Sequence, residues 1–132
     1  MSETAVLVVS HGGFADGLAD AARIILGSTE GLTALSIAEG ETPETFEQRL
    51  AESVTALQNG GKDVIVLADL PGATPANSTL KVLGEKAVLV TGVNLGMLLD
   101  VMQSREGHDA KELAAVAETS GRSSIIRPVL RM

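Results

Sequence analysis

The sequence predicts an α/β fold built on a doubly wound, mainly parallel sheet of four strands with helices on both faces. Short unbroken apolar runs alternate along the chain with segments of helical spacing, which is typical of this class. Strands that are apolar on both faces indicate a parallel sheet covered by helices on each side. The length of 132 residues corresponds to about one domain, so we expect a single domain over residues 1–132.

The predicted strands are residues 5–9, 32–38, 63–68 and 87–90. The second run alternates more loosely than the other three, but its apolar content still favours a strand. Right-handed crossovers commonly give the order 2-1-3-4 in such a sheet. The first and third strands are then neighbours, about 4.8 Å apart.

Helices are expected between the strands. The first covers about residues 14–26, with Gly27 as its C-cap and an inner face of Leu18, Ala22, Ile25 and Leu26. The second begins at Thr42 and Pro43 and stops at Asn59-Gly60-Gly61. Its apolar residues recur at helical spacing: Phe46, Leu50, Val54 and Leu57.

Three more helices and a terminal segment complete the prediction. Thr74-Pro75 repeats the start signal of Thr42-Pro43 and opens a helix through about Leu83. A helix with Met97, Leu98, Val101 and Met102 inward follows Asn94, and the last runs from about Asp109 to Glu118 before Gly121. Pro128 makes the C-terminal residues 123–132 an edge strand or an arm, which could pair with its own sheet or with a partner's.

Composition narrows the function classes. Asp and Glu total 17 against 10 Lys and Arg, a net charge of −7, which argues against nucleic acid or an anionic membrane as main partner and favours a basic one. The absence of cysteine excludes disulfides and thiol chemistry, and two histidines are too few for a multi-histidine metal cage. We expect no metal and no cofactor. The N-terminus has neither a basic region nor a long apolar run, so we expect a cytoplasmic protein.

The residues that follow the strands are the candidates for chemistry, because ligands of such sheets bind beyond the carboxyl ends of the strands. His11 follows the first strand and Asp69 the third, so we expect them at one edge within hydrogen-bonding distance. A carboxylate that accepts a hydrogen bond from Nδ1 would leave Nε2 as a nucleophile that faces solvent.

Other groups at this edge could bind a phosphoryl group on the histidine. Gly12 and Gly13 allow close approach of the backbone at a helix N-terminus, and the Thr74 hydroxyl could add a donor. Structural roles stay open as well. Asp69 could be a turn or cap residue before Pro71, and capping of its helix could be the whole role of Thr74.

The remaining polar candidates have simpler explanations. Asn94 is expected to cap the helix after it, and His108 to lie on a surface connection between two helices. The acidic residues Glu39, Glu41, Glu44 and Glu47 are expected to form a solvated face rather than a metal site, because acidic residues are favoured in the first turn of a helix.

Three segments at strand ends carry a resemblance to a known family. They are Val8-Val9-Ser10-His11-Gly12 with Phe14-Ala15-Asp16-Gly17-Leu18, then Asp69-Leu70-Pro71-Gly72-Ala73-Thr74-Pro75, then Gly92-Val93-Asn94-Leu95-Gly96-Met97-Leu98. In this order they resemble the enzyme IIA component of the mannose family of the bacterial phosphoenolpyruvate-dependent sugar phosphotransferase system, and nearly the whole chain can be laid on that family. This chain departs from the family pattern at two positions: Ala73 stands where the family usually has a second glycine, and Gly96 where it usually has a proline. Ala73 is therefore expected to restrict its loop, and Gly96 to loosen a helix start.

The resemblance implies a phosphoryl relay for sugar uptake. His11 would take a phosphoryl group from the phosphohistidine of HPr and pass it to an enzyme IIB component, with Asp69 orienting His11 and Thr74 binding the phosphoryl group. It also implies a homodimer that exchanges a C-terminal strand, and contact with the membrane only through permease components. A small apolar rim of Phe14, Leu70 and Pro71 would suit transient docking of a basic partner.

Other functions remain open at this stage. The protein could be a regulator that is phosphorylated on His11 without onward transfer, or the phosphoryl-relay subunit of a dihydroxyacetone kinase. Small tetrapyrrole metal chelatases also open with a strand and a Ser-His-Gly turn, but they need a second histidine in a cleft, for which only His108 is available. Histidine phosphatases have an arginine directly before the catalytic histidine, where this chain has Ser10, so the sequence argues against that class.

Overall fold

The structure is a computed structural model that describes residues 3–131. Its elements follow one another as β1 (Ala5–His11), α1 (Phe14–Leu26), β2 (Leu32–Ile37), α2 (Pro43–Asn59), β3 (Val64–Ala68), α3 (Thr74–Leu83), a 3₁₀ turn η1 (Gly84–Lys86), β4 (Leu89–Thr91), α4 (Leu95–Gln103) and α5 (Ala110–Ser123). The predicted alternation of strands and helices is confirmed.

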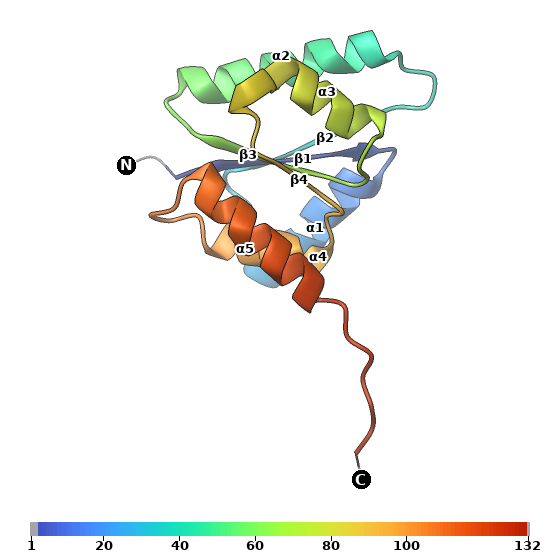
Figure 1. Cartoon of the computed structure of the whole chain (residues 1–132), viewed down its shortest axis with the longest axis vertical. Helices are drawn as coiled ribbons and strands as arrows, with labels where there is room; N and C mark the ends of the chain where they lie inside the picture. Colours follow the sequence, from blue (N-terminus) through green and yellow to red (C-terminus); the bar gives the residue numbers. More distant parts are fainter. Residues whose placement is uncertain (1–2, 132) are drawn as a thin grey trace.

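The four strands form one parallel sheet in the order β2-β1-β3-β4, as the sequence predicts. Helices α2 and α3 cover one face, whereas α1, α4 and α5 cover the other (Figure 1). The two central strands, β1 and β3, are therefore enclosed on both sides, which explains their unbroken apolar sequence.

The core has two layers, one on each face of the sheet. Side chains of β1 alternate between them, with Val6 and Val8 in one cluster and Leu7 and Val9 in the other. The first layer includes Ala22 of α1 and Leu98 of α4, and the second includes Phe46 of α2. An aliphatic core with one fully buried aromatic ring thus holds the strand ends in place.

Local signals set most of the helix ends. Gly27 adopts a left-handed conformation at the end of α1 with φ of 81°. Thr42 accepts a hydrogen bond from the N–H of Thr45, and Asn94 from the N–H of Met97, so both cap the helices that follow them. Asp109 caps α5 through a capping box with Glu112.

Three sequence expectations about helices are wrong in detail. Ile25 points outward with 57% of its surface exposed, while Ala15 is buried instead. Ala73 rather than Thr74 occupies the cap position of α3. Helix α5 continues past Gly121 to Ser123, because Gly121 serves close packing: a Cβ there would lie 2.7 Å from Cε of Met97.

Residues 124–131, here called the C-terminal arm, contain neither helix nor strand. The arm leads away from the body of the molecule (Figure 1). Its apolar side chains are all strongly exposed: Ile125, Ile126, Val129 and Leu130. Of the two forms expected for this segment, the described chain has the arm, and the outer edge of β4 has no neighbouring strand within residues 3–131.

The connection between α4 and α5 is less exposed than its polar sequence suggests. Arg105 is buried, forms an ion pair with Glu3 and donates a hydrogen bond of 2.8 Å to the carbonyl of Glu30. It passes so close to Gly31 that a side chain at Gly31 would collide with the guanidinium.

No helix within residues 3–131 has both the length and the apolar character to cross a membrane.

Candidate functional site

His11 and Asp69 meet at the carboxyl edge of the sheet. His11 is the last residue of β1, and Asp69 directly follows β3, its parallel neighbour. The ring atom Nδ1 of His11 lies 2.7 Å from Oδ2 of Asp69, which is the contact that the sequence predicts. The imidazole stays half exposed, whereas the Asp69 side chain is only 12% exposed.

This contact sets the chemistry of the ring. Because an ionised carboxylate only accepts hydrogen bonds, Nδ1 is assigned the proton, and the lone pair of Nε2 is free. Burial alone raises the pKa of Asp69, but hydrogen bonds from the His11 ring, the His11 N–H and the Leu70 N–H outweigh it, so the pKa is held below its usual range. Oδ1 accepts the bond from the Leu70 N–H at 2.9 Å. Asp69 therefore both stabilises its own turn and orients the His11 ring.

The turn between β1 and α1 is fixed by backbone contacts. Gly12 has φ of +54°, a conformation that favours glycine, and its N–H donates to the carbonyl of Ile37 at 3.1 Å. Gly13 is at the cap position of α1 and provides no side-chain cap. The Oγ of buried Ser10 accepts a hydrogen bond from the N–H of Ala15 at 2.8 Å instead, a contact with no obvious sequence signal because it spans five residues.

Thr74 opens α3 from the same edge of the sheet. Its hydroxyl makes no cap hydrogen bond, so capping does not explain this residue. Ala73 has φ of −105° and does not need glycine, whereas Gly72 does with φ of +71°. The expected restriction at Ala73 is therefore wrong. Asn77 supports the loop by donating a hydrogen bond to the carbonyl of Gly72 at 3.2 Å.

The three predicted rim residues are exposed. Phe14 begins α1, and Leu70 and Pro71 follow Asp69. Phe14 and Leu70 leave 45% and 55% of their surfaces exposed. Apolar side chains are therefore exposed on both segments that lead away from the site, at the start of α1 and directly after Asp69.

His108 lies far from this site. Its carbonyl accepts a hydrogen bond from Thr4, which comes just before β1, so His108 is at the amino edge of the sheet. The seven residues of β1 separate the two edges by about 20 Å. His108 is also exposed, as predicted, so the two histidines do not face a common cleft of the kind a chelatase needs.

The acidic residues around the start of α2 are only partly solvated. Glu41 forms two hydrogen bonds with Arg49, at 2.8 and 2.9 Å, and its side chain is 10% exposed. Glu47 pairs with Lys81 at 3.1 Å. The expectation of a solvated face is wrong for these two, because it overlooked their basic partners. No group of three or more His, Cys, Asp or Glu side chains in residues 3–131 is arranged to hold a metal ion.

Fold and site together define a class of protein: an open-sheet α/β protein that presents one carboxylate-paired imidazole to solvent at the carboxyl edge of its sheet. Comparison with known proteins narrows this class. Residues 5–118 match the model of the EIIA-man family, described as PTS system fructose IIA component, where PTS is the phosphotransferase system. The chain belongs to this family.

Individual relatives agree with the assignment. The chain is 27% identical over 124 residues to the PTS system mannose-specific EIIAB component of Escherichia coli K12, covering 92% of this chain and 38% of that protein. It is 28% identical over 110 residues to the PTS system fructose-specific EIIA component of Bacillus subtilis, covering 82% of this chain and 75% of that one. This chain therefore spans less than half the length of the E. coli relative.

Solved structures show the same fold. The mannose/sorbose specific IIA subunit from Enterococcus faecalis superposes with a TM-score of 0.89 at 25% identity, covering 99% of this chain and 98% of that one. The phosphotransferase system component EIIA from Streptococcus agalactiae gives 0.86 at 26% identity, covering 94% and 96%. These structures and the matching family model agree in assigning the chain to the EIIA-man family.

Proposed function

We propose that the protein is a phosphoryl relay that accepts a phosphoryl group on Nε2 of His11 from phosphorylated HPr and passes it to an enzyme IIB component for sugar uptake. The observation that carries the proposal is the 2.7 Å contact between Nδ1 of His11 and Asp69, which leaves Nε2 unprotonated on a half-exposed ring. The name of the E. coli relative, an EIIAB component, supports a IIB partner.

The transfer step balances without further reactants. The lone pair of Nε2 forms the new P–N bond while the P–N bond of the donor phosphohistidine breaks, and that bond's electron pair stays on the donor nitrogen. The His11 ring gains positive charge as its bond forms. The carboxylate of Asp69 faces that charge through Nδ1–H and stabilises it.

The groups around His11 suit the transferred phosphoryl group. Negative charge on its oxygens would be met by the backbone N–H group of Gly13, by the N-terminus of α1 and by the Thr74 hydroxyl. The N–H of Gly12 already donates to the Ile37 carbonyl, so Gly12 contributes through its conformation. Phe14, Leu70 and Pro71 form the rim on which the partners would dock in turn. The net charge of −7 favours partners with a basic surface.

Labelling with phosphoenolpyruvate, enzyme I and HPr tests the acceptance step. We expect acid-labile phosphate on the wild type and on His108→Ala, and none on His11→Ala. His108→Ala is a matched control because its imidazole is exposed at the opposite edge of the sheet. Absence of label on the wild type, or equal label on His11→Ala, would refute the proposal.

Onward transfer separates a relay from a regulator. The phosphorylated protein would be isolated and mixed with enzyme IIB components of the mannose family, and movement of the label would be followed. A relay loses its label to one of them within seconds. A protein that keeps its phosphoryl group with every one of them is a regulator instead.

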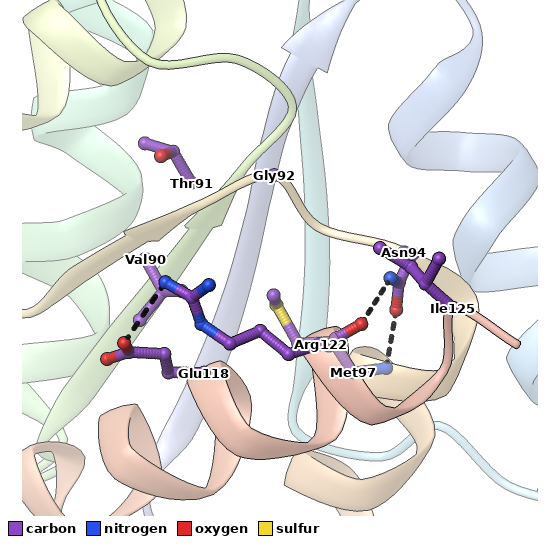
Figure 2. A pocket seen from close by; sticks show the side chains of 9 residues that line it. Val90, Thr91, Gly92, Asn94, Met97, Glu118, Arg122 and Ile125 are labelled. Atoms are coloured by element: carbon purple, nitrogen blue, oxygen red, sulfur yellow. Dashed lines mark hydrogen bonds and ion pairs between the residues drawn. The ribbon is translucent and has the colours of Figure 1, made fainter.

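We also propose that the C-terminal arm pairs with a second copy of the chain. Ile125 of the arm lies at a groove beside β4, and Ile126, next in the sequence, is strongly exposed. The groove is lined by Val90, Thr91, Gly92, Asn94, Met97, Glu118, Gly121, Arg122 and Ile125 (Figure 2). Ile126→Asp should turn a dimer into a monomer in light scattering, whereas the control Ile24→Asp, an exposed isoleucine on α1, should remain a dimer. A monomeric wild type would contradict this.

A further inference from the structure

Two serine hydroxyls lie beside the turn between β1 and α1 that follows His11. Ser10 of β1 and Ser36 of β2 are paired in the sheet register, and their Oγ atoms are 3.1 Å apart. Ser10 directly precedes His11 and is fully buried. A buried hydroxyl needs hydrogen-bond partners, so these contacts define what Ser10 does.

Ser10 replaces the missing cap of α1. The first N–H groups of a helix have no carbonyl partner within the helix, and a side chain at the cap position usually accepts one of them. Gly13 cannot do so, and the Oγ of Ser10 accepts the Ala15 N–H at 2.8 Å instead. The bond closes the turn that contains His11 into a ring. The hydroxyl proton of Ser10 remains available for Ser36 Oγ or for the His11 carbonyl at 3.3 Å.

The bonds of this turn decide which N–H groups are left for a ligand. The N–H of His11 donates to Asp69, that of Gly12 to the Ile37 carbonyl and that of Ala15 to Ser10. Within residues 3–131, the N–H groups of Gly13 and Phe14 have no such partner. These two amides stand at the N-terminus of α1, where the helix dipole favours negative charge.

We propose that Ser10 is a positioning residue for phosphoryl transfer: its hydroxyl, held against Ser36, fixes the first turn of α1 so that the free amides of Gly13 and Phe14 face the phosphoryl group on His11. This inference rests on the proposed function. Donors that are already oriented stabilise charge in the transition state without reorganisation, so loosening them lowers the rate of transfer rather than the affinity for the donor.

Steady-state phosphorylation of Ser10→Ala, Ser10→Thr and the wild type by phosphorylated HPr tests the proposal. We expect Ser10→Ala to lower kcat about tenfold with KM changed less than about twofold, because the rim that docks HPr is untouched. Ser10→Thr keeps the hydroxyl and should recover most of the rate. In the unphosphorylated protein, amide hydrogen exchange at Ala15 should accelerate in Ser10→Ala and stay slow in Ser10→Thr.

Three results would overturn the proposal: a wild-type kcat for Ser10→Ala, a defect in KM alone, or a Ser10→Thr variant as impaired as Ser10→Ala. If circular dichroism shows that Ser10→Ala is unfolded, Ser36→Ala decides, since it keeps the Ser10 to Ala15 bond but removes the neighbour of Ser10. That variant should lose about threefold in kcat, and an unchanged kcat would contradict the proposal. Failure to label wild-type His11 would instead reject the proposed function, whereas exchange at Ala15 tests the cap without phosphorylation.

Discussion

One carboxylate oxygen of Asp69, Oδ2, lies 2.7 Å from Nδ1 of the His11 ring and 3.0 Å from the backbone nitrogen of the same residue. Ring and main chain are therefore held by one acceptor, which fixes the tautomer and limits rotation of the ring about its side-chain bonds. The arrangement follows from the pairing of β1 with β3, because His11 and Asp69 end neighbouring parallel strands.

Asp69→Asn should slow phosphoryl acceptance by about 100-fold, because a neutral amide neither balances the charge on the ring nor selects one tautomer. The initial rate of label transfer from phosphorylated HPr measures the effect. Asp20→Asn is the control, since Asp20 is exposed on α1 and pairs with Arg23. An Asp69→Asn variant as fast as Asp20→Asn would mean that the carboxylate does not act on the ring.

Gly12→Ala should lower the free energy of unfolding by about 1 kcal/mol through backbone strain alone. Gly12 has φ of +54°, and a Cβ there would meet nothing within 4 Å. Gly13→Ala is the matched variant, because Gly13 has φ of −82° and equally open space, so it should fold as stably as the wild type. Urea titrations followed by circular dichroism compare the two, and equal stabilities would contradict the assigned conformation of the turn.

Glu41→Gln should remove part of the acid sensitivity of folding. The hydrogen bond from Arg49 and that from the Ala38 N–H lower the pKa of Glu41 below 4.5, and they outweigh burial, which raises it. A carboxyl with a lower pKa in the folded state stabilises the fold above its unfolded pKa and loses this contribution as the pH falls through the folded pKa. The wild type should therefore have a higher free energy of unfolding than Glu41→Gln near pH 7, and this difference in free energy should shrink below pH 4.5.

Urea titrations at several pH values between neutrality and acid check this prediction. Glu44→Gln provides the control, because Glu44 is exposed in the first turn of α2 and makes no ion pair with Arg49. It should follow the wild type across the range. A constant difference between wild type and Glu41→Gln at every pH would show that the pair with Arg49 does not govern the titration.

Gly96→Ala should destabilise the protein by about 2 kcal/mol through overpacking. A Cβ at Gly96 would lie 1.8 Å from Oγ and 2.8 Å from Cβ of Ser124, at the base of the C-terminal arm. The double variant Gly96→Ala/Ser124→Gly should recover most of the loss, which a double-mutant cycle from urea titrations measures. Independent effects of the two substitutions would contradict the contact.

The sheet order and the pairing of His11 with Asp69 are predictable from sequence because both depend on strand order alone. Apolar runs identify the strands, and right-handed crossovers then place the first and third side by side. The caps at Thr42 and Asn94 are predictable for a similar reason, since each acts on the helix that directly follows it.

What the sequence did not reveal depends on contacts across the fold. The sequence predicts a solvated face for Glu41, whereas the structure pairs it with Arg49 on the helix that follows. The sequence also predicts that Gly121 ends α5, whereas Gly121 packs against Met97 of α4. For Gly96, expected to loosen a helix start, the structure supplies a different reason in the approach of Ser124. The Oγ of Ser10 caps α1 by accepting the N–H of Ala15 five residues later, a spacing that no standard capping pattern describes.

The few aromatic rings of this chain lie in different environments, so their NMR signals can report on different events. The sequence has two phenylalanines, two histidines and neither tyrosine nor tryptophan, so its aromatic proton spectrum holds only four side chains. Phe46 is buried in the core, and Phe14 is exposed beside the site. His11 carries the proposed chemistry, while His108 at the far edge can act as an internal reference. One spectrum can therefore follow folding, docking and phosphorylation through separate signals.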